Sequence, residues 1–161
     1  MGENQQYVVM LVDILNKQLK TLEEILEVTK QQEVIATEIP FDNDKFEDTL
    51  SRKDVLIIRL NELDDGFSSV YSKVRRVVNE YPEQYREQVV EMQNVIRRCT
   101  DIGTEIKTLE IRNRDKLTKC FAGKKQEYSA KQAAATVANK YSVTMKNVNL
   151  MGEGYRFNQD K

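Results

Sequence analysis

A long seam of apolar residues between Tyr85 and Phe121 constrains the fold of this chain most strongly. The segment, YREQVVEMQNVIRRCTDIGTEIKTLEIRNRDKLTKCF, contains no proline and one glycine. Its apolar positions recur at alternating intervals of three and four residues, at Met92, Val95, Cys99, Ile102, Ile106 and Leu109. This spacing is typical of a long helix that packs against partner helices. The seam therefore predicts helix packing and, by itself, no chemistry.

Composition favours the helical class for the whole chain. The 161 residues include six glycines, two prolines and no tryptophan, and 32% are charged, which suits exposed helices better than a thick globule. We predict an all-α fold, an elongated antiparallel helical bundle or coiled coil of three long helices. A weakly ordered amphipathic C-terminal helix or tail should follow. The predicted domains are a bundle over residues 1–128 and a partner-binding tail over residues 129–161.

Two further helices should precede the seam. The first should cover about Gln5 to Ala36, and its wide apolar stripe predicts burial against two neighbours. The second carries the clearest heptad pattern, at Leu56, Leu60, Leu63, Phe67, Val70, Val74, Val77 and Tyr81. Gly66 interrupts it at a cost of about 1 kcal/mol, which burial of the stripe outweighs.

Pro82 predicts a turn that sends the third helix back against the second. The third helix should extend as far as about Tyr128, with a bend or end possible near Gly123.

The segment TEIPFDND, residues 37–44, separates the first two helices because it contains Pro40 and several turn-forming residues. Asp42 can act as the N-cap of the second helix, with Phe41 and Phe46 as a hydrophobic staple. A competing arrangement uses Asp44 as the cap, with Glu47 three residues later.

Charge is distributed unevenly along the chain. Residues 1–111 carry 14 Lys and Arg against 22 Asp and Glu, whereas residues 112–161 carry 11 against 4. The basic last third suits binding of nucleic acid or another anionic surface. It equally suits a solvated helix face with cations near a helix C-terminus, which is the interpretation we favour. We therefore expect no nucleic-acid partner.

Catalytic and metal-binding patterns are missing from the sequence. There is no histidine, which is the commonest general base and metal ligand. No phosphate-binding glycine loop, nucleophile elbow or zinc-ligand spacing occurs. Cys99 lies on the seam, and neither it nor Cys120 belongs to a Cys-x-x-Cys pair, so both should be structural or incidental. We expect a protein that is not an enzyme and that has no cofactor and no metal.

Hydropathy predicts neither a membrane span nor a signal peptide. The longest apolar run, YVVMLV at residues 7–12, is six residues long, whereas a spanning helix needs about 20. No basic start followed by an apolar stretch and a small-residue cleavage site is present. We therefore expect a cytoplasmic protein without membrane insertion.

Two segments carry a resemblance to a known family. The segment LSRKDVLIIRLNELDDGF, residues 50–67, and the segment IKTLEIRNRDKLTKCF, residues 106–121, precede a Lys-rich stretch and a tail that contains tyrosine. Together they resemble the FlgN-type flagellar export chaperones over nearly the whole chain. That family has a Leu-x-x-Lys-x-x-Leu-like second helix and an ending similar to Ile-x-x-Leu-Glu-x-x-Asn. The ending is matched here by Ile106, Leu109, Glu110 and Asn113.

The resemblance implies a cytoplasmic chaperone that binds the C-terminal segments of hook–filament junction proteins. Such a chaperone prevents premature assembly and delivers its substrates to the flagellar type III export gate. FlgN-like proteins bind substrate through their C-terminal region and dock the gate through a tyrosine there. Tyr128 and Tyr141 are both candidates for that tyrosine.

After about Ser129 the apolar stripe thins to one side chain every four residues, so ordering this segment should require a partner surface. We expect it to fold as an amphipathic helix on its target, although packing back on the bundle remains an alternative. The predicted partner-binding residues are Leu117, Phe121, Tyr128, Val137, Tyr141, Met145 and Val148. A self-associating structural or regulatory coiled coil, and hence a homo-oligomer, is the alternative function.

Overall fold

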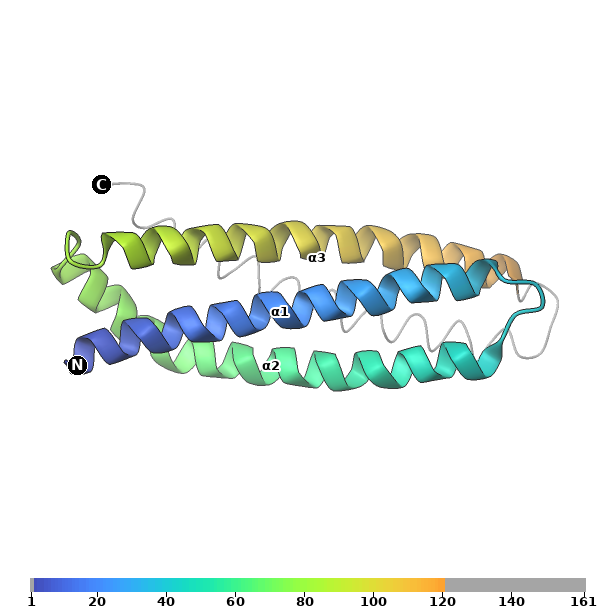
Figure 1. The fold of residues 1–161 in the computed structure, drawn as a ribbon, viewed down its shortest axis with the longest axis horizontal. Coiled ribbons are helices and arrows are strands. Elements are labelled where there is room, and N and C mark those ends of the chain that lie inside the picture. The colour runs from blue at the N-terminus through green and yellow to red at the C-terminus, as the bar shows by residue number, and fades with distance from the viewer. Residues whose placement is uncertain (1, 121–161) are drawn as a thin grey trace.

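Three long helices make up the part of the chain that the structure, a computed structural model, describes, which is residues 2–120. They are α1 (Glu3–Thr37), α2 (Asn43–Glu80) and α3 (Arg86–Cys120). Consecutive helices run in opposite directions and give an elongated bundle (Figure 1). The predicted all-α bundle is confirmed, and α2 and α3 run unbroken through Gly66 and Gly103. The predicted extension to Tyr128, the bend near Gly123 and the boundary at residue 128 lie outside the described residues.

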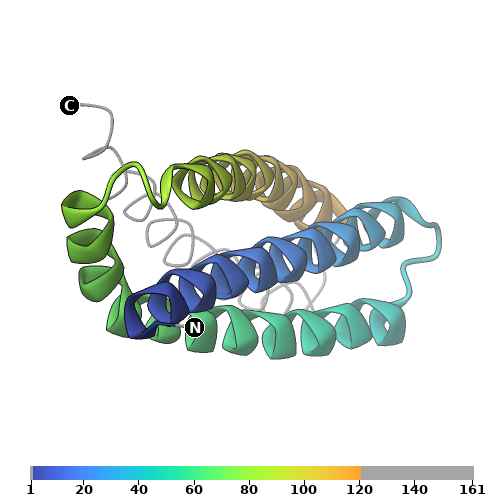
Figure 2. The ribbon, with the colours of Figure 1, turned by 60° about the vertical axis from the view of Figure 1, so that its left-hand side comes forward.

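The central helix is α1, which packs against both α2 and α3. The wide apolar stripe of α1 therefore meets two neighbours, as its sequence predicts. By contrast, α3 packs along α1 and not mainly along α2, contrary to our expectation. The physical reason is that the stripe of α1 is wide enough to serve both partners, and each partner buries its seam there. Figure 2 shows the last turns of α2 bending toward the start of α3.

Local sequence signals set the helix ends. The Asp42 side chain caps α2, because its carboxylate accepts a hydrogen bond from the Lys45 backbone N–H at 3.1 Å. The Phe41 and Phe46 rings lie 5.7 Å apart between centroids and form the predicted staple. The other end of α2 is Glu80, so Tyr81 lies in the following turn and is 43% exposed. The α2 seam therefore ends at Val77 and Val78, and the prediction that Tyr81 belongs to it is wrong.

The core divides into two apolar clusters of different size. The larger one extends from Val8 to Val28 on α1, from Leu56 to Val78 on α2, and from Tyr85 to Ile106 in and before α3. The smaller cluster lies at the end of the bundle where α1 turns into α2, and it comprises Ile35, Ala36, Phe46 and Leu117. Six buried polar side chains occur in the intervening stretches of the three helices, and they are described below. None of the described helices is both long enough and apolar enough to span a membrane.

Candidate interaction site

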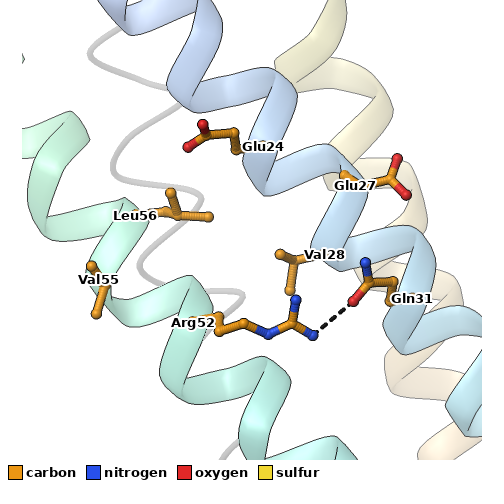
Figure 3. A pocket seen from close by; sticks show the side chains of 7 residues that line it. All are labelled: Glu24, Glu27, Val28, Gln31, Arg52, Val55 and Leu56. Atoms are coloured by element: carbon orange, nitrogen blue, oxygen red, sulfur yellow. Dashed lines mark hydrogen bonds between the residues drawn. The ribbon is translucent and has the colours of Figure 1, made fainter.

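A shallow groove runs between α1 and α2 in the half of the bundle nearer the turn that joins them (Figure 3). Its volume is about 420 Å³, and its apolar lining comes from Val28 on α1 and from Val55 and Leu56 on α2. The polar lining consists of Glu24, Glu27 and Gln31 on α1 and Arg52 on α2. An open groove with an apolar lining and charged edges suits the apolar face of an amphipathic helix.

A second depression of about 330 Å³ continues the groove toward the turn between α1 and α2. Gln31 and Arg52 line both depressions and separate them, since Arg52 Nη2 donates a hydrogen bond to Gln31 Oε1 at 2.7 Å. Arg52 Nε also pairs with Asp48 Oδ2 at 3.2 Å. Three large apolar side chains on these two helices remain more than half exposed, namely Val34, Val55 and Ile58. We call the two depressions together the α1–α2 groove.

Six buried polar residues lie between the two apolar clusters, and we call them the polar layer. They are Thr29, Gln32, Thr49, Lys53, Glu110 and Asn113. All three helices contribute, because the first two residues belong to α1, the next two to α2 and the last two to α3. Among the described residues, the other buried polar side chains are Gln18 and Thr21 on α1.

Lys53 is the centre of the polar layer and is fully buried. Its Nζ donates to Gln32 Oε1 and forms an ion pair with Glu110 Oε1, so it connects α2 to both neighbouring helices. Burial lowers the pKa of Lys53 from 10.5 to about 6, because the ammonium has lost its water. The Glu110 carboxylate acts in the opposite direction, since it favours the charged ammonium.

Hydrogen bonds connect the remaining members of the polar layer. Gln32 Nε2 donates to Thr49 Oγ1 at 3.0 Å, which joins α1 to α2. Asn113 Nδ2 donates to the Thr29 backbone carbonyl at 3.2 Å, which joins α3 to α1. The layer thus contains direct polar contacts between each pair of helices, including α2 and α3, whose backbones do not pack closely together.

The predicted partner-binding residues are described only in part. Leu117 is 3% exposed and packs in the smaller apolar cluster with Ile35, Ala36 and Phe46. The other predicted partner-binding residues, Phe121, Tyr128, Val137, Tyr141, Met145 and Val148, lie outside the described residues. Cys120 marks where the described chain stops, and its Sγ donates to the Ala36 carbonyl at 3.3 Å. The described part of α3 therefore ends at the α1–α2 end of the bundle.

The two cysteines occupy different environments. Cys99 is buried, and burial raises the pKa of its thiol to about 12, so a reactive thiolate does not form near neutral pH. Its predicted position on the buried seam is confirmed. Cys120 is exposed. Among the described residues, no group of three or more His, Cys, Asp or Glu side chains has an arrangement that suits a metal ion.

Our interpretation of the sequence missed the groove and the polar layer. The groove leaves no clear pattern, because exposed Val55 and Ile58 lie outside the α2 heptad. The layer does leave a signal, since Lys53 lies three residues before Leu56 and seven before Leu60, on the heptad positions themselves. A charged residue at a seam position indicates a buried partner.

No family model matches the chain, and no curated protein and no solved structure shows significant similarity to it.

Proposed function

We propose that the chain is a cytoplasmic export chaperone of the FlgN type. Its substrates would be the C-terminal helical segments of flagellar hook–filament junction proteins. Binding would keep these segments from assembling prematurely and would deliver them to the flagellar type III export gate. The proposed role is recognition and delivery, without a catalytic step, cofactor or metal.

The proposal rests on the positions of the residues that carry the resemblance to the FlgN-type family. Lys53 and Leu56 come from one segment, whereas Ile106, Leu109, Glu110 and Asn113 come from the other, and all six are buried. The two segments are brought together by the Lys53–Glu110 ion pair. The resemblance therefore rests on residues that hold the bundle together, and not on scattered surface positions. This is the kind of residue that a shared helical scaffold would require.

The α1–α2 groove supports binding of a helical partner. Its lining offers apolar side chains along two helices, together with Glu24, which pairs with Arg59 at 3.2 Å, and Glu27. Residues 1–120 carry 18 Lys and Arg against 23 Asp and Glu. The expected occupant is thus an amphipathic helix of the substrate, with basic residues flanking its apolar stripe.

The segment after Cys120 would complete the partner site. It carries 7 Lys and Arg against 3 Asp and Glu, together with the apolar candidates Val137, Tyr141, Met145 and Val148. These residues would pack on a second face of the captured helix. Tyr128 or Tyr141 would then be the gate-docking tyrosine that the resemblance implies.

Binding of the full chain to a synthetic peptide with the C-terminal helix of a junction protein tests the proposal. Fluorescence anisotropy should show saturable binding, and Val55→Asp should weaken it about tenfold or more, because a carboxylate would enter the apolar groove. Tyr141→Asp tests the C-terminal segment in the same way. Val90→Asp is the matched control, since Val90 is a half-exposed valine on α3 and does not line the groove.

The outcomes separate the elements of the proposal. Absence of peptide binding by the unaltered chain would refute the chaperone function. Equal affinities for the Val55→Asp and Val90→Asp variants would leave the function intact but remove the groove from it.

A self-associating structural or regulatory coiled coil remains the second candidate. It is favoured by the exposed pair Val55 and Ile58, which are three residues apart and lie on one face of α2. Light scattering over a range of protein concentrations distinguishes the two. A sharp, concentration-dependent oligomer without peptide binding would favour the coiled coil.

A further inference from the structure

The polar layer separates the two apolar clusters at a point where an uninterrupted apolar seam would have been possible. Lys53 lies on the heptad positions of α2, between Phe46 and Leu56, where an apolar side chain would continue the stripe. Glu110 is likewise buried next to Leu109 on α3. Removing two ionisable groups from water is costly, and an apolar pair of similar volume is often at least as stable. The layer therefore requires an explanation other than stability.

The bonding pattern of the layer depends on one alignment of the helices. Lys53 contacts Gln32 and Glu110 together, so α1, α2 and α3 must all be in register. Sliding one helix by a heptad preserves the apolar seam but moves the paired groups apart by about 10 Å. Lys53 or Glu110 would then be buried without its partner. A slipped bundle loses the ion pair, whereas the apolar clusters alone would tolerate it.

The same penalty applies to pairing with a second copy of the chain in another alignment. The seams of α2 and α3 are long and regular, which are features that allow alternative coiled-coil pairings. An alternative pairing would have to bury Lys53 against apolar side chains. The polar layer raises the free energy of these competitors more than it raises that of the native arrangement.

We propose that the Lys53–Glu110 layer selects a single register of α1, α2 and α3, against slipped bundles and against misaligned pairing with a second copy of the chain. Lys53 acts as the positioning residue, because its amine contacts both Gln32 and Glu110 only when the three helices are in this register. This role concerns the folding of the chain alone and does not depend on the proposed substrate.

The test uses the full chain and the double variant Lys53→Met, Glu110→Leu, which replaces the pair by apolar groups of similar size. The unaltered chain should elute as one species at all concentrations, with one set of amide cross-peaks in the NMR spectrum. The double variant should keep or raise the thermal midpoint. It should nevertheless give more than one species, seen as concentration-dependent mass or multiplied cross-peaks.

Two controls exclude trivial explanations. The double variant Glu23→Gln, Arg98→Gln removes an exposed ion pair between α1 and α3 and should change neither assembly nor the spectrum. The single variant Lys53→Met should lower the thermal midpoint, because Glu110 remains buried without the amine that donates to it.

Three outcomes would overturn the proposal. One is a double variant that remains a single species with one set of cross-peaks. Another is a double variant that melts well below the unaltered chain, because the polar layer would then stabilise the bundle and would not serve to select its register. The third is an unaltered chain that is itself a mixture of species.

Discussion

The middle of the bundle and its end near the α1–α2 turn contain the same three helices but are packed by different chemistry. In the middle, Leu22, Leu60 and Ile106 belong to one large cluster and are fully buried. Toward the end, Lys53 and Glu110 interrupt the apolar packing, and only a small cluster follows. Apolar contacts are not directional, whereas hydrogen bonds and ion pairs require one geometry. The middle therefore supplies stability, and the end specifies alignment.

The largest effect should follow from breaking the buried pair on one side. Lys53→Met leaves the Glu110 carboxylate buried without the Lys53 amine that donates to it and should lower the free energy of unfolding by about 3–5 kcal/mol. Urea denaturation followed by circular dichroism measures this loss. Adding Glu110→Leu should recover most of it, because no unpaired charge then remains. If the double variant is as unstable as the single one, the loss is not due to an unpaired charge.

Shortening an apolar side chain in the middle of the bundle should lower the free energy of unfolding by a similar amount. A second substitution, such as the one that compensates Lys53→Met, should not restore this loss. Leu60→Ala removes a fully buried side chain and should lower the free energy of unfolding by about 2–5 kcal/mol through lost burial and a cavity. Leu60→Met, which conserves volume, should cost less than about 1.5 kcal/mol. Equal losses for the two variants would mean that the packing around Leu60 does not depend on volume.

The difference between the two regions also explains what the sequence could predict. Apolar periodicity repeats over many residues, so α1, α2 and α3 and most of their buried positions can be predicted from it. The Asp42 cap with its Phe41–Phe46 staple is a short local signal and is predictable too. The packing partner of α3 is not, because a regular seam fits α1 and α2 equally well.

The periodicity of apolar residues cannot predict polar contacts between segments that are far apart in the sequence. Lys53 and Glu110 are 57 residues apart, and no spacing rule connects them before the helices are placed in space. Lys53 on the seam could have indicated a buried charge, but its partner could not have been chosen among the many carboxylates of α1 and α3. The α1–α2 groove is similarly formed by residues of two helices that each look ordinary alone. Of the predicted partner-binding residues, only Leu117 is described, and it is buried in the small cluster.

Stability should depend on pH through Lys53, with a smaller effect. The folded state holds this amine with a pKa near 6, against 10.5 for an unperturbed lysine. Between these values the unfolded chain binds more protons than the folded chain, so the free energy of unfolding should increase as pH rises above about 6. The slope for one such group is at most about 1.4 kcal/mol per pH unit.

The groups that face Lys53 define the control for this pH dependence. Glu110 on α3 is a titratable group that the Lys53 amine contacts, whereas Gln32 on α1, which it also contacts, does not titrate. Urea midpoints between pH 6 and pH 8 should rise in the unaltered chain relative to the double variant Lys53→Met, Glu110→Leu. Parallel curves for the two proteins would show that Lys53 does not change its protonation on folding.

The smallest change in the free energy of unfolding should follow from removing a solvent-exposed ion pair between two helices. Arg98 Nη2 on α3 lies 3.3 Å from Glu23 Oε1 on α1, and the two side chains are 65% and 47% exposed. Water and salt screen such a pair, so Arg98→Gln should change the free energy of unfolding by no more than about 0.5 kcal/mol. The change should vanish at high ionic strength. If Arg98→Gln lowered the free energy of unfolding nearly as much as Lys53→Met, the stabilising effect of an ion pair would come from joining two helices and not from its burial. The expected contrast instead assigns the effect to burial, because both pairs join α3 to a neighbouring helix and differ chiefly in their access to water.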